Sequence, residues 1–312
     1  MKAFLKFVEI QTKVASVFPF MMGTLMALYL DQNIDGLNLI LMLVSLICID
    51  MATTGYNHLF DYKRALLKTG YHYEQHNPIS SGELKVTSAQ IGLMLLVGMG
   101  AIAGILLVLR TDMLILILGG LAFGVGLGYS MGPLPLSRTI LGELFSGVFM
   151  GGLITFISAY IHFDAAQIIR IYNIDQIVTL WINFSLVLPI LMISIPLIFL
   201  ISNIMLANNI CDMSEDFINK RYTLPISIGL VNSKRLYFGL VVGAYLALLI
   251  GMILKILPFQ FALVDLTIPV IWIQTQAFLR EPVKSKTFKM AVKNFILFAM
   301  AMVLSMILAL WM

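Results

Sequence analysis

The sequence predicts an all-α membrane protein, a single polytopic domain over residues 1–312 whose nine transmembrane helices cross the bilayer. Of the 312 residues, 60% are hydrophobic and only 12% carry a charge, whereas a soluble domain has about 25% charged residues and about half apolar ones. The apolar residues also gather into nine stretches, each near the length of about 20 residues that a bilayer crossing needs. Lipid is therefore the expected environment of most of the chain.

The nine predicted spans are joined by polar connections. They cover residues 14–30, 38–58, 88–109, 113–131, 140–161, 183–207, 236–255, 258–279 and 290–311. Before the first span, Lys2, Lys6 and Lys13 accompany an apolar run that has no small-residue cleavage site, so we expect an amphipathic lead-in at the membrane surface and no removable signal peptide. The polar, amphipathic segment 163–180 is expected to lie on the outer surface.

The distribution of basic residues predicts the orientation. With the N-terminus in the cytoplasm, 17 of the 20 Lys and Arg residues fall on the cytoplasmic side, and only Arg110, Arg170 and Lys255 fall outside. This asymmetry follows the positive-inside rule. It predicts a multi-pass protein of the cell membrane, with the loops after spans two, four, six and eight in the cytoplasm and the C-terminus outside. The net charge of +4 is explained by this topology, and no nucleic-acid partner is expected.

Two polar clusters interrupt the apolar pattern. Asn57 and Asp61 lie four residues apart near the end of span two, and Asn208, Asp212 and Asp216 share the same spacing after span six, so each cluster occupies one helical face. Carboxylates four residues apart repel each other, and the cost increases near lipid.

A divalent cation is the simplest way to offset this repulsion. Mg²⁺ prefers oxygen ligands and is commonly bound by one or two carboxylates together with substrate phosphates. One such Asp at a cytoplasmic helix end is often only a solvated residue. Two clusters, each followed by basic residues and both on the same predicted membrane face, favour a Mg²⁺–diphosphate site whose ligand keeps a long hydrocarbon tail in lipid. The two cysteines, Cys48 and Cys211, show no metal-ligand spacing, and a structural disulfide is not expected.

Five motifs in order along the chain carry a resemblance to a known family. They are Glu9-Ile10-Gln11-Thr12-Lys13 with Phe18-Pro19 and Gly23-Thr24; Asn57-xxx-Asp61; Asn77-Pro78-Ile79-Ser80-Ser81-Gly82; Tyr129-Ser130-Met131-Gly132-Pro133-Leu134-Pro135-Leu136 with Leu141-Gly142-Glu143; and Asn208-Asn209-Ile210-x-Asp212-xxx-Asp216 followed by Lys220-Arg221-x-Thr223-Leu224. Together they resemble the UbiA superfamily of intramembrane prenyltransferases. Within it, they are most similar to the branch that prenylates 1,4-dihydroxy-2-naphthoate in menaquinone synthesis.

The resemblance implies a fold, a reaction and a set of site residues. The fold would be nine helices around a central cavity, capped on the cytoplasmic side by the loops after spans two and six. The reaction would be the Mg²⁺-dependent transfer of a polyprenyl group from polyprenyl diphosphate to an aromatic acceptor, giving demethylmenaquinone from 1,4-dihydroxy-2-naphthoate. The implied residues are Asn57, Asp61, Asp212 and Asp216 for Mg²⁺, Asn208, Lys220 and Arg221 for the bound diphosphate complex, and Tyr129 and Arg138 for the pocket where ring and allylic carbon meet.

Several positions depart from the family pattern, and alternatives stay open. His58 stands where an Asp is common, Ala65 where a third Asp is expected, Asn77 where Arg is usual and Asn219 where Gly is usual, which leaves the number of metal ions and full catalytic competence open. Hydroxybenzoate, another quinone precursor or a porphyrin are alternative acceptors. A transporter or channel would also contain intramembrane acids, but there the acids would lie near the midplane and not at one membrane face. A non-catalytic relative is the third alternative.

Overall fold

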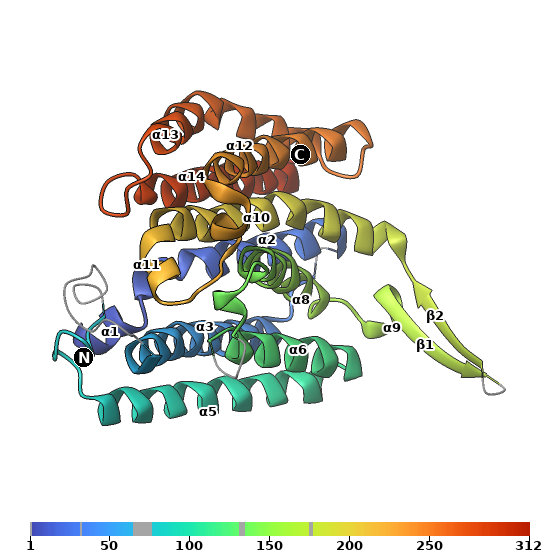
Figure 1. Ribbon diagram of the computed structural model, residues 1–312. Helices are drawn as coiled ribbons and strands as arrows, with labels where there is room; N and C mark the ends of the chain where they lie inside the picture. Colours follow the sequence, from blue (N-terminus) through green and yellow to red (C-terminus); the bar gives the residue numbers. More distant parts are fainter. Residues whose placement is uncertain (1, 32, 65–76, 131–134, 175–176) are drawn as a thin grey trace.

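The computed structural model describes residues 2–31, 33–64, 77–130, 135–174 and 177–312 as a bundle of long helices lying side by side (Figure 1). The long single helices are α2 (Val14–Asp31), α3 (Gly36–Arg64), α5 (Val86–Arg110), α6 (Met113–Ser130), α10 (Phe184–Cys211), α12 (Leu224–Ile253) and α14 (Phe288–Trp311). In this part of the chain, eight segments are long and apolar enough to cross a membrane, and the shorter apolar helix Met113–Tyr129 brings the set to the nine predicted. The polytopic helical fold is confirmed.

Two of these crossings are composite. The first consists of α7 (Gly142–Ser146), the π-helical η3 (Gly147–Leu153) and α8 (Ile154–Tyr160), and the second of the 3₁₀ segment η4 (Phe259–Thr267) and α13 (Ile268–Arg280). The first packs on α10 with no side chain between the backbones: a Cβ on Gly151 would lie 2.5 Å from the Ile198 backbone nitrogen. Close helix packing in membranes selects such small residues.

Two stretches differ from the sequence-based expectation. The segment expected to be an amphipathic surface stretch forms α9 (Ala165–Ile168) and an antiparallel hairpin of β1 (Ile169–Ile174) and β2 (Ile177–Ile182), so the all-α prediction is wrong here. Both strands are rich in β-branched and aromatic residues, which favour extended backbone over helix. The seventh span begins at Leu224 rather than residue 236, with a break at Gly229, whose φ is +79°.

The two ends of the bundle differ in character. Figure 1 shows the hairpin projecting from one end, and α1 (Lys2–Phe7) and α11 (Met213–Ile218) at the other, which we call the site end. There a small buried cluster fastens α1 to α3 and α5. It comprises Phe7, Val8, Leu59, Ile79, Ala89 and Leu93. The main core lies among α2, α10, α12 and α14, while residues such as Leu109, Leu266 and Ile273 point outward as expected for a surface in lipid.

Candidate active site

The two acidic motifs meet at one arginine at the site end. Asp61 lies in the last turn of α3, and Asp216 lies in α11. The Arg221 guanidinium lies between them, with Nε 3.3 Å from Asp216 Oδ1 and Nη1 3.7 Å from Asp61 Oδ2. The structure therefore brings together two carboxylates that the sequence could only assign to separate helices.

Asp216 is the most deeply buried acid of this group, with 3% of the residue exposed. Burial raises the pKa of Asp216 to about 6; the Asp212 and Asp61 carboxylates add to the rise, and Arg221 opposes it. Its Oδ2 atom has no hydrogen-bond partner among the described residues. An oxygen ligand that is buried, acidic and unsatisfied is suited to a cation.

The second acidic cluster is joined by a residue that the sequence analysis missed. Lys284 follows α13, and its Nζ contacts both Asn208 Oδ1 and Asp212 Oδ2, the latter at 2.5 Å. Asn208 Nδ2 also donates to Asp212 Oδ2 at 3.2 Å. The sequence indicates only a cytoplasmic loop charge at Lys284, because nothing in the local sequence links it to α10.

Arg138 and the turn after α11 support Arg221. Arg138, in η2 (Leu136–Arg138), donates from Nη2 to the Asn219 carbonyl at 2.5 Å, and its own carbonyl accepts from the Tyr222 amide at 3.1 Å. Arg221 donates to the Ser137 carbonyl at 3.3 Å. The exposed Lys220 adopts a left-handed φ of +54° on this turn. The structure thus places Arg138 against the backbone of the turn that carries Arg221 and Lys220.

Tyr129, at the end of α6, reaches the same region. Its hydroxyl has no hydrogen-bond partner among the described residues and lies near enough to Arg221 for an electrostatic interaction. Glu143 of α7 is buried at 4% exposure and accepts from Asn209 Nδ2 at 2.8 Å, which ties α7 to α10 beside the Asn208 cluster. Residues 131–134 of the Tyr129 motif lie outside the described residues.

His58 is directed towards the N-terminal segment. Its Nε2 lies 3.3 Å from Glu9 Oε1, and its carbonyl accepts from Asn77 Nδ2 at 2.8 Å. Burial alone would raise the pKa of Glu9, but the His58 hydrogen bond and charge, with Lys13 and Lys284, lower it. The structure therefore uses His58 to join α3 to Glu9, while Asn57 lies one turn before Asp61. Ala65 lies outside the described residues.

The ligand atoms at this site are of the type that Mg²⁺ prefers. Carboxylate and amide oxygens converge from the ends of α3 and α10 and from α11, and Mg²⁺ takes oxygen ligands with near-octahedral geometry. Among the residues that the structure describes, no three His, Cys, Asp or Glu side chains are grouped closely enough to hold an ion as they stand. Arg221 and Lys284 balance the acids instead.

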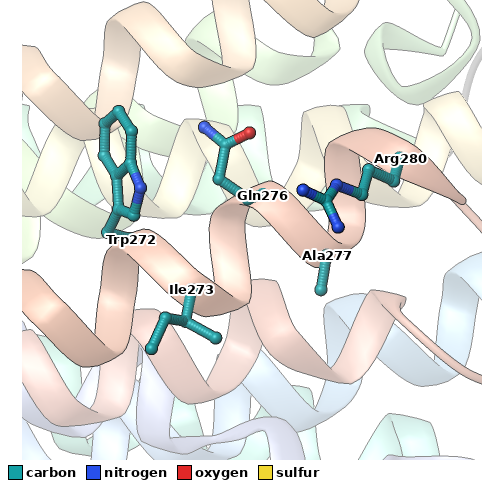
Figure 2. Close-up of a pocket in the computed structure, with 5 residues that line it drawn as sticks. All are labelled: Trp272, Ile273, Gln276, Ala277 and Arg280. Carbon is teal, nitrogen blue, oxygen red and sulfur yellow. The ribbon is translucent and has the colours of Figure 1, made fainter.

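A separate hollow lies along the outer face of α13. Figure 2 shows its lining residues on successive turns of this one helix: Trp272, Ile273, Gln276, Ala277 and Arg280. It contains no carboxylate, so it is distinct from the acidic cluster.

Comparison with known proteins defines the class. The sequence profile of the UbiA prenyltransferase family matches residues 16–300, and the chain belongs to this family. Over 223 residues the chain is 31% identical to the 1,4-dihydroxy-2-naphthoate octaprenyltransferase of Bacillus subtilis (strain 168). That match covers 70% of this chain and 63% of the relative, so the chain spans less than two thirds of the relative's length. The predicted resemblance to the UbiA superfamily is confirmed.

Solved structures share the fold. A UbiA homologue from Aeropyrum pernix K1 in its apo form is 17% identical with a TM-score of 0.68, over 93% of this chain and 98% of that chain. A digeranylgeranylglyceryl phosphate synthase is 18% identical with a TM-score of 0.64, over 98% of each chain. A UbiA homologue from Archaeoglobus fulgidus, bound to GPP and Mg²⁺, is 12% identical with a TM-score of 0.64, over 99% of this chain and all of that chain.

Proposed function

We propose that this protein is a Mg²⁺-dependent membrane prenyltransferase that moves a polyprenyl group from its diphosphate onto 1,4-dihydroxy-2-naphthoate, giving demethylmenaquinol, the reduced form of demethylmenaquinone. The observation that carries the proposal is the meeting of Asp61 and Asp216 at Arg221. The naphthoate acceptor is supported by the identity to the Bacillus subtilis octaprenyltransferase, and the diphosphate and Mg²⁺ by the bound Archaeoglobus fulgidus homologue of the same fold.

The proposed role of each side chain follows from its charge and from its position at the site end. Asn57, Asp61, Asp212 and Asp216 hold the ion through oxygen atoms, with Asn208 beside them. Mg²⁺ bound there supplies Lewis-acid neutralisation of the diphosphate leaving group. Arg221 and Lys220 contact the diphosphate oxygens, because guanidinium and ammonium groups bind phosphate by charge-assisted hydrogen bonds.

The reaction separates positive and negative charge, and the side chains and helices around the site assist this separation. As the allylic carbon–oxygen bond breaks, positive charge develops on the carbon and negative charge on the diphosphate. The electron-rich ring carbon of the acceptor forms the new bond, and the naphthoate ring loses carbon dioxide. Apolar helices exclude water that would otherwise capture the carbon. Tyr129 faces the reacting end from α6, and Arg138 holds the turn that presents Arg221.

The orientation is part of the proposal. The site end, with the N-terminus, would lie in the cytoplasm and the C-terminus outside, as the distribution of Lys and Arg favours. Single cysteines introduced in an otherwise cysteine-free protein, at Lys286 and at Lys255, would test this with a membrane-impermeant maleimide on intact cells. Labelling at residue 255 alone supports the orientation, and labelling at residue 286 alone reverses it.

A turnover assay tests the activity. The purified protein in detergent is supplied with Mg²⁺, a polyprenyl diphosphate and 1,4-dihydroxy-2-naphthoate, and product mass and diphosphate release are followed. Prenylated, decarboxylated product that disappears with EDTA supports the proposal. Diphosphate release with another acceptor would replace the acceptor but keep the reaction class. No reaction with any acceptor, from protein that is folded, would contradict the enzyme assignment.

A further inference from the structure

A hydrogen-bonded turn fixes the backbone position of Lys284. Thr287 is buried, and its hydroxyl donates to the Glu281 carbonyl at 2.6 Å and accepts from the Val283 amide at 2.8 Å. The Thr287 amide closes the turn by donating to the Val283 carbonyl at 2.8 Å. These bonds fix the backbone on both sides of Lys284, so its side chain leaves from a defined point.

The Lys284 side chain turns into the acidic cluster. A lysine at a membrane surface normally extends its ammonium group into water, but this side chain is only 25% exposed and touches Asn208 and Asp212. Its ammonium also lies 5.3 Å from the centre of the Phe288 ring and acts electrostatically on Glu9 and Asp216. Lys286, two residues further on, pairs with Glu281 and is 68% exposed.

The oxygen atoms that Lys284 engages are those that a cation in this site would need. A metal ion that took Asp212 Oδ2 and Asn208 Oδ1 as ligands would compete with the Lys284 ammonium for the same oxygen atoms. Two cations sharing these ligands would also repel each other. Metal binding therefore favours release of the ammonium, and the new anion available to it is the diphosphate that arrives with the metal. The flexible four-carbon stem of lysine permits such a move.

We propose that Lys284 is an internal placeholder cation: it holds Asp212 and Asn208 while the site lacks metal, and it transfers to the substrate diphosphate when the metal binds. This inference rests on the proposed function, because it concerns the same site. It predicts that metal and diphosphate bind cooperatively. Metal alone has to displace Lys284 without offering it a new anionic partner, whereas metal with diphosphate supplies one.

The test measures binding without turnover. Mn²⁺ replaces Mg²⁺ and is titrated by electron paramagnetic resonance into detergent-purified protein, with and without inorganic diphosphate. In Lys284→Gln we expect the affinity for Mn²⁺ alone to rise on the order of tenfold, and the enhancement by diphosphate to shrink by a similar factor. Lys284→Arg, which keeps the charge, should stay close to the unsubstituted protein. Lys286→Gln is the matched control and should change neither value.

The outcomes separate the two proposals. If the unsubstituted protein binds Mn²⁺ with diphosphate but Lys284→Gln binds Mn²⁺ no more tightly, the placeholder role is overturned while the metal-dependent function stands. If the unsubstituted protein binds no Mn²⁺ under either condition, the proposed function and the placeholder fail together. If Lys284→Gln and Lys284→Arg both bound Mn²⁺ more tightly than the unsubstituted protein, the proposal would also be overturned, because the effect would then not depend on the charge at residue 284.

Discussion

Arg221 contacts Asp216 through both its side chain and its main chain. Its side-chain Nε lies 3.3 Å from Asp216 Oδ1, and its backbone amide donates to the Asp216 carbonyl at 2.8 Å. The main-chain bond closes the end of α11 and fixes where the guanidinium begins. The acid and the base are therefore placed as a unit, and Asp61 completes the group from α3.

Asp216→Asn should abolish most turnover while the protein remains folded. The amide keeps the shape of the side chain but removes the charge that would hold the metal. Loss of one such electrostatic contact lowers kcat on the order of 10²–10³-fold. Diphosphate release measures the effect, and Asp265→Asn serves as a control, because η4 follows the end of α12 that lies away from this cluster. Full activity of Asp216→Asn would remove Asp216 from the metal set.

Arg221→Lys should raise KM for the prenyl diphosphate more than Arg235→Lys does. Lysine keeps the positive charge but cannot serve Asp61 and Asp216 together from one planar fork. Arg235 lies on the exposed face of α12 and provides the same substitution away from the cluster. Initial rates at varied prenyl diphosphate measure the effect. Equal KM values for both variants would contradict a role of Arg221 in diphosphate binding.

Lys13 and Asp50 form a buried pair inside the bundle, apart from the Asp61 cluster. Lys13 Nζ lies 2.7 Å from Asp50 Oδ1 and donates to Thr54 Oγ1 at 2.7 Å, while Ser16 donates to Asp50 Oδ2 at 2.5 Å. Removing one partner of a buried pair leaves an uncompensated charge and costs about 3–5 kcal/mol.

Lys13→Met should therefore lower the melting temperature in detergent more than the double variant Lys13→Met with Asp50→Leu. The double variant removes both charges and replaces them with apolar groups, so no ion stays buried. A double variant that melts below the single one would contradict this account of the pair.

His162 should make the protein less stable in mild acid. It is buried at 8% exposure after α8, and its Nδ1 accepts from the Asp35 amide at 3.3 Å. Burial lowers the pKa of His162 to about 4, although the Asp35 carboxylate opposes this. The neutral ring is favoured in the folded state, so its stabilisation is complete above the unfolded pKa of about 6.5 and is lost progressively as pH falls towards 4.

Melting temperatures at pH 7.5 and pH 5 measure this effect. The melting temperature of the unsubstituted protein should fall more between pH 7.5 and pH 5 than the melting temperature of His162→Gln. Glutamine cannot titrate but offers a similar polar group. Parallel curves for the two proteins would show that His162 does not contribute to the pH dependence.

The features of the fold and the site that depend on local sequence patterns could be predicted from the sequence. Hydropathy located the nine apolar helices, although the seventh begins at Leu224 and not at residue 236. Four-residue spacing placed Asp61, Asp212 and Asp216 at helix ends that the fold brings to one region. It could not show that Lys284 and Arg221 neutralise these acids, because those contacts join segments distant in sequence. The hairpin was not predicted, because the β-branched residues of its strands stand within a polar, amphipathic stretch that indicates only a surface segment.

The glycine contacts indicate which helices are held together rigidly. A Cβ on Gly23 would lie 2.2 Å from the Thr155 carbonyl oxygen, and one on Gly151 would lie 2.5 Å from the Ile198 nitrogen. The seams between α2 and α8 and between α10 and η3 are therefore closed by main-chain contact and form a rigid slab. Along α6, a Cβ on Gly119, Gly120 or Gly124 would have no described atom within 4 Å. At these three glycines no such backbone seam ties α6 to its neighbours, so we expect this side of the bundle to move more easily than the slab.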